Sequence, residues 1–307
     1  MKISVVLCAY NPDISYLTRV IDSLKKQTLD QNQWEFILID NKSTPALADP
    51  IYVEWHSFGR IIRENKPGLI HARVRGAMEA KHEIIVSVDD DTPLFADYLE
   101  HVVRIYSAYP DMGVIGGRTI PEFAVTPPDW ILEFHTCLAI RDLGDEVIIE
   151  NVRNTPDSKA YPRAAPLLIA PKRSCLLEYI EHYKQNELSQ SLGRKGNDLR
   201  SGEDNDINFF IFRKGYSLGY FPELKFIHLI PEKRLRRKYL ADLSEASGKS
   251  WIELQQAYGI NSWPKIPKWT LKLRKLRSYV RHRAWASDPN YIHWRESCGK
   301  FDALANL

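Results

Sequence analysis

Cysteine is scarce in this sequence, and the four that occur lie far apart. Cys8, Cys137, Cys175 and Cys298 form no C-x-x-C pair and no cluster with histidine. This spacing argues against a structural zinc site and against a framework of disulfides, and it is typical of a protein kept in a reducing compartment. We therefore expect a cytoplasmic location.

Long apolar runs are also missing. The first run, Ile3 to Cys8, is too short for a signal peptide and is closed by Asn11-Pro12. Nothing later approaches the roughly 18 uncharged apolar residues that a membrane-spanning helix needs. We expect a protein that is soluble or attached only to the surface of a membrane.

Two common glycine-rich phosphate loops are absent as well. No G-x-G-x-x-G follows the first apolar run, and no G-x-x-x-x-G-K-[ST] occurs. Dinucleotide-binding and Walker-type sites are therefore disfavoured. The 307 residues can nevertheless form one large α/β domain or two ordinary ones, with a core that needs no covalent cross-links.

Strand and helix patterns alternate through the first part of the chain. Short apolar runs typical of buried strands are found at residues 3–8, 34–39, 61–62, 84–88 and 114–115. Apolar residues at helical spacing are found at 14–24, 69–80 and 98–105. This alternation predicts an α/β protein with a mostly parallel sheet flanked by helices. We expect the strand at 114–115 to end at Gly116-Gly117.

The middle of the chain gives weaker signals. Residues 118–160, rich in proline and charge, are interpreted as an insertion or a lid beside the sheet. Further elements are expected as a strand at 167–170 and helices at 174–183 and 207–212. The polar, glycine-containing segment 193–202 is interpreted either as a loop that closes over a substrate or as a simple connection.

Three acidic residues in a row follow the fourth predicted strand. Asp89, Asp90 and Asp91 repel one another at neutral pH, so a fold that places them at a strand end normally supplies a cation. Alternate residues of an extended chain point the same way, so Asp89 and Asp91 can face one ligand while Asp90 turns aside into hydrogen bonds. The alternative is that Asp91 and Thr92 only cap the next helix.

Other polar residues follow the first two strands, where an open parallel sheet binds its ligands. Ala9, Tyr10 and Asn11 come after the first strand, and Asp40 ends the second. Asp40 can accept hydrogen bonds from a nucleobase or ribose, and Tyr10 can cover the ring. The alternative for residues 40–43 is an Asx-type turn.

Two further segments carry candidate chemistry. Glu203 and Asp204 open a predicted helix, so one can cap it while the other serves as a general base; capping alone is the alternative. His228 follows a predicted strand end at 226–227 and precedes a basic cluster at 233–237. It can ligate a metal beside cations that hold a diphosphate, although a single histidine is usually an ordinary core or surface residue.

In combination these motifs resemble the inverting glycosyltransferases of family 2, which have the Rossmann-like GT-A fold. The resemblance covers residues 3–240, and its segments read VVLCAYN, DNKS, ENKPGLIHARVRGAMEA, VDDDT, GEDND and HLIPEKRLRRKYL. It implies a catalytic domain at 1–240 and a helical, basic extension at 241–307. It also implies transfer of a sugar from a nucleotide-diphosphate donor, a UDP-sugar, to an acceptor hydroxyl in polysaccharide or glycolipid assembly.

The resemblance assigns a role to each candidate residue. The donor is held by Ala9, Tyr10, Asn11 and Asp40 at the uridine, Arg73 near the diphosphate, and Asp89 towards the ribose with Asp90 beside it. The metal is held by Asp91 and His228. Asp204 is the catalytic base, with Glu203 as the second candidate. We expect positions 40, 91, 204 and 228 to meet around one hollow.

The chemistry implied is a single displacement that depends on a divalent cation. Oxygen ligands favour Mg²⁺ or Mn²⁺, and an imidazole ligand tilts the choice towards Mn²⁺. Two departures from the family pattern limit the transfer of roles. Asn41 stands where many relatives have a second acid, and the region at 165–173 differs from the usual acceptor motif.

Acidic residues are absent from the stretch 265–285, which is strongly basic. Its eight cations are Lys265, Lys268, Lys272, Arg274, Lys275, Arg277, Arg281 and Arg283, so with a total charge of +3 the rest of the chain is net acidic. Interleaved apolar residues predict a basic amphipathic helix that binds an anionic membrane surface, the inner face of the cell membrane. A helix packed on the catalytic domain with a solvated basic face is the alternative. No nucleic-acid-binding module accompanies it.

Three competing functions agree less well with this pattern. A phosphohydrolase with the D-x-D-x-[TV] motif is disfavoured, because Pro93 occupies the required Thr or Val position. A nucleotidyltransferase of similar architecture would need a glycine-rich loop where this chain has Cys8-Ala9-Tyr10-Asn11. The third is a catalytically silent protein that binds sugar nucleotides or acts as a scaffold, which we would expect to have lost one of the acids.

Overall fold

The computed structural model describes residues 1–153, 160–166, 170–193, 199–200, 202–260 and 263–307. By internal packing the chain forms two compact units that alternate along the sequence. The first consists of Met1–Glu122, Ile140–Gln185 and Ile207–Leu229, and the second of Phe123–Ala139, Asn186–Asp206 and Ile230–Leu307. The division into domains at 1–240 and 241–307 stays a prediction.

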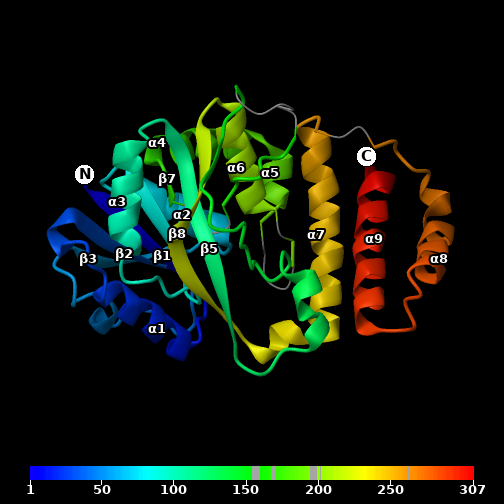
Figure 1. Cartoon of the computed structure of the whole chain (residues 1–307), viewed down its shortest axis with the longest axis horizontal. Coiled ribbons are helices and arrows are strands. Elements are labelled where there is room, and N and C mark those ends of the chain that lie inside the picture. The colour runs from blue at the N-terminus through cyan, green and yellow to red at the C-terminus, as the bar shows by residue number, and fades with distance from the viewer. Residues whose placement is uncertain (154–159, 167–169, 194–198, 201, 261–262) are drawn as a thin grey trace. The chain divides into compact units, whose positions relative to one another are not determined.

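A four-stranded parallel sheet lies at the centre of the first unit, in the order β3-β2-β1-β4 (Figure 1). Its strands are β1 (Ile3–Ala9), β2 (Trp34–Asp40), β3 (Gly59–Arg63) and β4 (Ile84–Asp89). Every residue of β1 and β2 is buried, which explains their nearly continuous apolar sequences. The connecting helices are α1 (Ile14–Lys25), α2 (Leu69–Glu79) and α3 (Tyr98–Ala108). The predicted α/β class is therefore confirmed.

The register of this sheet brings several strand ends to one edge. Ala9 pairs with Asp40, Cys8 with Asp89, and Asp40 with Arg63. Because the strands are parallel, the residues that follow β1, β2, β3 and β4 all leave the sheet on the same side. This edge is where the predicted donor-binding residues lie.

A second sheet of the first unit has the order β6-β8-β5-β7. Its strands are β5 (Met112–Phe123), β6 (Ile148–Glu150), β7 (Ala170–Pro171) and β8 (Ser217–Ile230). The pairs β5–β7 and β6–β8 are antiparallel. Part of the segment 118–160, predicted as an insertion or lid, therefore belongs to this sheet. Of the strand predicted at 167–170, only Ala170 lies within the described residues.

Strand β5 does not end at Gly116-Gly117, as the sequence had suggested, but runs through them. A side chain at Gly117 would overlap the backbone carbonyl oxygens of Phe221 and Leu224 on β8. The missing Cβ therefore permits the two backbones to approach, and glycine here marks close contact between strands.

The remaining helices of the middle region agree with the apolar spacing. They are α4 (Arg173–Gln185), α5 (Glu187–Ser191) and α6 (Glu203–Arg213). Both predicted helices, at 174–183 and 207–212, lie inside longer elements. Most of the glycine-containing segment 193–202 falls outside the described residues.

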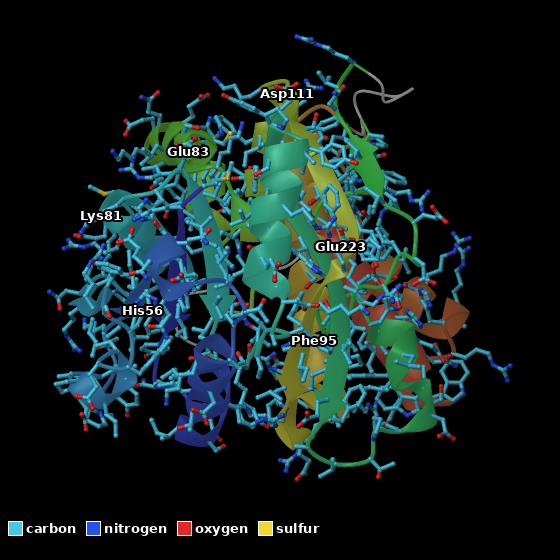
Figure 2. All side chains as sticks on the ribbon, turned by 60° about the vertical axis from the view of Figure 1, so that its left-hand side comes forward. His56, Lys81, Glu83, Phe95, Asp111 and Glu223 are labelled. Atoms are coloured by element: carbon cyan, nitrogen blue, oxygen red, sulfur yellow. The ribbon has the colours of Figure 1, made fainter. Side chains whose placement is uncertain are left out.

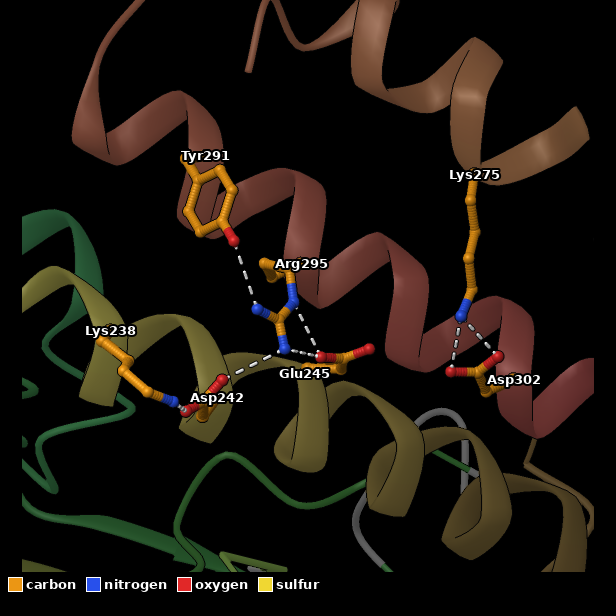
Figure 3. A network of polar contacts seen from close by, with 7 residues as sticks. All are labelled: Lys238, Asp242, Glu245, Lys275, Tyr291, Arg295 and Asp302. Atoms are coloured by element: carbon orange, nitrogen blue, oxygen red, sulfur yellow. Dashed lines mark hydrogen bonds and ion pairs between the residues drawn. The ribbon is translucent and has the colours of Figure 1, made fainter. Parts of the chain in front are cut away.

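The second unit contains three long helices that lie side by side (Figure 1): α7 (Arg237–Ala257), α8 (Leu271–Arg281) and α9 (Asp288–Asn306). Helices α7 and α9 approach closely, since a side chain at Gly299 would overlap the carbonyl oxygen of Glu245. Around this crossing, Arg295 donates hydrogen bonds to Asp242 and Glu245 (Figure 3). No helix in the described part of the chain is both long enough and apolar enough to cross a bilayer.

Candidate active site

Asp40, at the end of β2, is surrounded by contacts from the chain itself. Its buried carboxylate accepts hydrogen bonds from the backbone N–H of Ser43 at 2.9 Å and of Leu47 at 3.3 Å. The guanidinium of Arg63, at the end of β3, also donates to it and forms an ion pair. The Ser43 contact resembles the Asx-type turn expected as the alternative for residues 40–43, but it reaches three residues along the chain where an Asx turn reaches two. Asp40 therefore anchors this loop, whatever else it binds.

The residues after β1 are tied to the same loop. The backbone N–H of Asn11 donates to Ser43 Oγ at 2.9 Å, and Asn11 Oδ1 accepts from the N–H of Thr44 at 2.7 Å. Asn11 has a φ of 44°, in the left-handed region that asparagine enters more readily than most residues. Ala9 is buried, whereas the side chain of Tyr10 is exposed and can cover a bound ring.

Asn41 holds the loop that leads into α2. Its Nδ2 donates to the carbonyl oxygen of Lys66, and its Oδ1 accepts from the N–H of Gly68, both at 2.8 Å. Gly68 has a φ of 126°, which a residue with a side chain rarely adopts. An amide can make both contacts because it donates and accepts, and a carboxylate in its place would repel the Lys66 carbonyl. Asn41 therefore positions the segment that carries Arg73.

The three consecutive acids lie at the end of β4 in two different settings. Asp89 is the last residue of the strand, and Asp90 and Asp91 form the turn after it. Thr92 closes this turn, since its Oγ1 is 3.0 Å from both the backbone nitrogen and the carbonyl oxygen of Asp89. The extended geometry predicted for this segment is therefore wrong. Asp90 is partly buried in the turn.

The alternative that Asp91 and Thr92 cap the next helix is also wrong. Helix α3 begins at Tyr98, and its N-cap position is occupied by Asp97. Residues 91–95 instead run beside β8. The backbone N–H groups of Leu229 and Ile227 donate to the carbonyl oxygens of Asp91 at 2.9 Å and of Pro93 at 2.8 Å.

This antiparallel pairing explains how Asp91 meets His228. Nε2 of His228 lies 3.6 Å from Oδ2 of Asp91, and the imidazole is buried. The pairing continues at Phe95, whose N–H donates to the carbonyl oxygen of Lys225 at 3.1 Å; Figure 2 labels Phe95 on this segment. His228 lies within β8, which extends to Ile230, and does not follow the strand as predicted. The two side chains are adjacent because their backbones are paired.

Arg73 faces the first acid of the triplet. It lies on α2, is buried, and places Nη2 at 3.8 Å from Oδ1 of Asp89. Asp89 and Asp91 thus have different protein partners, one a guanidinium and the other an imidazole. The arrangement offers a cationic group and an acidic group side by side at the carboxyl edge of the sheet.

A divalent metal fits this edge only with ligands added from outside the protein. Among the described residues, no three His, Cys, Asp or Glu side chains are gathered closely enough to hold a metal ion. Asp91 and His228 supply one oxygen and one nitrogen, a donor set that Mn²⁺ accepts. Phosphate oxygens and water would have to complete the shell.

Glu203 and Asp204 belong to the second unit and occupy the first turn of α6. Asp206 lies in the same turn, is buried, and accepts a hydrogen bond from Tyr258 Oη at 2.7 Å. Carboxylates in a first turn are favoured by the helix dipole, so these acids stabilise the start of α6. Glu203 is buried and Asp204 partly exposed. The expected meeting of Asp204 with Asp91 and His228 stays a prediction.

Arg63 and Thr92 were not among the predicted site residues. Arg63 ends the third strand, so inspection of the residue at every strand end would have found it, as it found Asp40. For Thr92 the sequence pattern predicts only a helix cap. Its role in closing the turn after β4 follows from hydrogen bonds that the sequence pattern does not distinguish from capping.

Comparisons with known proteins agree with this architecture. Residues 4–160 match the model of a family described as "Glycosyl transferase family 2". A glucosyl-dolichyl phosphate glucuronosyltransferase from Haloferax volcanii is 23% identical over 256 residues, which is 81% of this chain and 76% of that protein. Polypeptide N-acetylgalactosaminyltransferase 5 from Caenorhabditis elegans is 31% identical over 230 residues, 72% of this chain but only 36% of the relative.

Solved structures show the same fold. S. aureus TarS 1–349 has a TM-score of 0.53 and 15% identity, and the match covers 97% of this chain and 91% of that one. TarS 1–349 in complex with UDP-GlcNAc has a TM-score of 0.52 and 14% identity, with the same coverage. At this level of identity the likeness concerns the fold, which is GT-A. The family match covers half of the chain, and we conclude that this chain belongs to glycosyl transferase family 2 and is a glycosyltransferase.

Proposed function

We propose that this chain is a metal-dependent inverting glycosyltransferase that moves a sugar from a UDP-sugar to an acceptor hydroxyl in polysaccharide or glycolipid assembly. The observation that carries the proposal is the approach of His228 Nε2 to within 3.6 Å of Asp91 Oδ2 at the carboxyl edge of the sheet. Arg73 and Asp89 lie at the same edge. The dispersed cysteines, three of them buried, support a cytoplasmic location.

The residues at the ends of β1 and β2 suit the nucleoside. Tyr10 presents an exposed ring that can cover the base, and Asn11 and Asp40 hold the loop at residues 43–44 by hydrogen bonds. Ala9 is buried at the end of β1, and we assign it to the same site. The carboxylate of Asp40 accepts three hydrogen bonds from the protein, and such a group has about four acceptor positions. One position therefore remains for the N–H of a uracil.

Next to the nucleoside, charge complementarity favours a diphosphate. Arg73 supplies a buried guanidinium that can form charge-assisted hydrogen bonds with phosphate oxygens. We assign its neighbour Asp89 to the ribose. Asp91 and His228 would hold a Mn²⁺ or Mg²⁺ ion, which stabilises the negative charge that grows on the departing diphosphate. We assign Asp90, which is partly buried in the turn, to the donor site beside its two neighbours.

Inversion requires a base on the opposite side of the sugar from the diphosphate. We assign Asp204 to remove the proton of the acceptor hydroxyl as that oxygen attacks, with Glu203 as the second candidate. Asp204 is the more exposed of the two, and an acceptor must reach the base. The acceptor is a carbohydrate or lipid-linked glycan, a class supported by the name of the Haloferax relative, a glucosyl-dolichyl phosphate glucuronosyltransferase.

A thermal-shift panel tests the donor and the metal together. UDP-, GDP- and CMP-sugars are added with and without Mn²⁺, and we expect the UDP-sugar with Mn²⁺ to raise Tm most. A ligand at one hundred times its Kd stabilises a protein by about 2.7 kcal/mol. In Asp91→Asn the contribution of Mn²⁺ should be lost, whereas Glu122→Gln, a change on the surface, should behave as the wild type.

Two outcomes would count against the proposal. Equal or absent shifts with all three donors would reject the UDP-sugar assignment. Binding of a UDP-sugar without any Mn²⁺-dependent release of UDP, measured by a coupled assay, would favour a catalytically silent sugar-nucleotide-binding protein.

A further inference from the structure

Helix α8 carries its large apolar side chains on the outside of the second unit. Leu273 is 66% exposed, Leu276 61% and Val280 56%, and Trp269, in the turn η5 (Lys268–Thr270) that leads into the helix, is 83% exposed. Successive members are three or four residues apart, so they form one stripe along the helix, which we call the apolar stripe. A helix on the surface of a globular protein normally turns such a stripe inward.

The opposite side of α8 packs against α9 through residues that lie outside the apolar stripe. Nζ of Lys275 lies 2.7 Å from Oδ1 of Asp302, a contact drawn in Figure 3. The ring of Tyr279 meets that of Trp294 edge to face, with the centroids 5.0 Å apart. Leu271 packs on a small apolar cluster that includes residues 303–305. The exposure of the apolar stripe therefore leaves the fold of this unit intact.

Positive charge borders the apolar stripe on both sides. Among the described residues, no ion pair is made by the exposed side chains of Lys268, Lys272, Arg274, Arg277, Arg281 and Arg283. No acidic residue occurs between 263 and 287 to neutralise them. Trp285, beyond the helix end, adds a second exposed indole. The surface thus combines an apolar centre, a cationic border and an indole at each end.

We propose that α8 binds an anionic phospholipid bilayer, with its axis along the membrane plane and the apolar stripe at the boundary of headgroups and acyl chains. The cations would then meet lipid phosphates, and indoles favour the membrane–water interface. A second copy of this chain is a poorer occupant, because a symmetric contact would set the same cations against each other. The inference rests on the proposed function in one respect: a lipid-linked acceptor lies in a membrane, so an enzyme that binds the membrane can reach it.

Vesicle flotation without any donor tests the proposal. The full chain should float with phosphatidylcholine vesicles that contain phosphatidylglycerol and not with phosphatidylcholine alone. The double variant Leu273→Ser/Leu276→Ser should bind at least about tenfold more weakly, since two apolar side chains leave the bilayer. Lys272→Gln/Arg277→Gln should bind roughly 25-fold more weakly, because each close cation contributes about fivefold. Ile51→Ser, an exposed apolar position of the first unit, is the matched control and should bind as the wild type.

Further readouts decide the outcome. Quenching of tryptophan fluorescence by brominated lipid should fall in Trp269→Phe/Trp285→Phe, and binding should weaken at high salt. Equal flotation with both vesicle types, or normal flotation of the leucine variant, would overturn the inference. If light scattering showed a dimer for the wild type and a monomer for the leucine variant, while vesicle binding stayed the same, the apolar stripe would instead be a site of self-association. Because the donor-induced Tm shift is measured separately on the same proteins, failure of vesicle binding leaves the transferase proposal standing.

Discussion

The carboxylate of Asp40 accepts hydrogen bonds from Ser43, Leu47 and Arg63, while Asp89 and Asp91 face Arg73 and His228. Acidic residues that the sequence does not distinguish therefore have different structural roles. Asp40 chiefly organises a loop, whereas Asp89 and Asp91, at the end of β4 and in the turn after it, lie beside a guanidinium and an imidazole. Only the partners of each side chain separate these roles, because the residue type is the same.

At the scale of single residues, the sharpest test concerns Asp204. Asp204→Asn keeps the size of the side chain but removes its ability to accept a proton. We expect turnover to fall about 10²- to 10⁴-fold, the usual cost of losing a general base, while the Tm shift produced by the donor is retained. Measurement of kcat and of the donor-induced shift on the same preparation checks both parts.

Glu203→Gln is the matched control, since it makes the same chemical change one position earlier. We expect a much smaller loss of turnover from it. If Asp204→Asn turned over normally and Glu203→Gln did not, the base would be Glu203. Normal turnover in both variants would show that neither residue at the start of α6 is the general base.

At the scale of elements, β8 organises the first unit more than its apolar pattern suggests. It pairs with β6 and β5 in the second sheet, and its end pairs with residues 91–95, the segment that follows β4. One strand thus places His228 opposite Asp91. The predicted metal ligands come together because a strand late in the chain is paired with a segment about 135 residues earlier.

Gly117 is where this arrangement can be tested by mutation. A methyl group there would overlap two carbonyl oxygens of β8, and backbone cannot move aside as a flexible side chain can. We expect Gly117→Ala to lower the free energy of unfolding by about 2 kcal/mol or more, measured by urea denaturation. Glu122→Ala in the same strand loses only an exposed ion pair with Arg19 and should cost at most about 1 kcal/mol. Equal costs for the two changes would contradict the close approach of β5 and β8.

At the scale of the whole molecule, stability should depend on pH through His56. This buried imidazole packs on Trp34, with ring centroids 4.2 Å apart, and its Nδ1 accepts a hydrogen bond from the N–H of Phe58. Burial lowers the pKa of His56 from 6.5 to about 4. Above pH 6.5 the folded and unfolded chains are both neutral at this position. As the pH falls towards 4, His56 binds a proton in the unfolded chain but stays neutral in the folded one. The free energy of unfolding therefore decreases.

The loss expected from this histidine between pH 6.5 and 4 is about 3 kcal/mol, because each unit of pKa difference corresponds to about 1.4 kcal/mol. Urea denaturation at pH 7.5, 6, 5 and 4 measures it. His56→Gln should be less stable at pH 7.5 but should show a flatter dependence on pH over this range. His135→Gln, at an exposed position, should keep the wild-type dependence. An unchanged slope in His56→Gln would show that other groups cause the acid lability.

Much of the parallel sheet and its helices could be predicted from sequence, since their signals are local. Buried strands such as β1 and β2 are short apolar runs, and a helix such as α1 repeats apolar residues every three or four positions. The rule that ligands bind at the carboxyl ends of parallel strands then selected Tyr10, Asp40 and the acids after β4. Because each of these signals lies within about ten residues, the chain order was enough to find them.

Tertiary structure alone decided the features that depend on contacts between distant residues. The continuation of β5 through Gly117, the pairing of residues 91–95 with β8 and the ion pair of Arg63 with Asp40 all depend on partners from other elements. The sequence by itself determined the fold class, the family resemblance and the kinds of side chain available at the strand ends. Which side chains meet was set by strand register and by packing between segments far apart in the chain, and neither is encoded in the spacing of neighbouring residues.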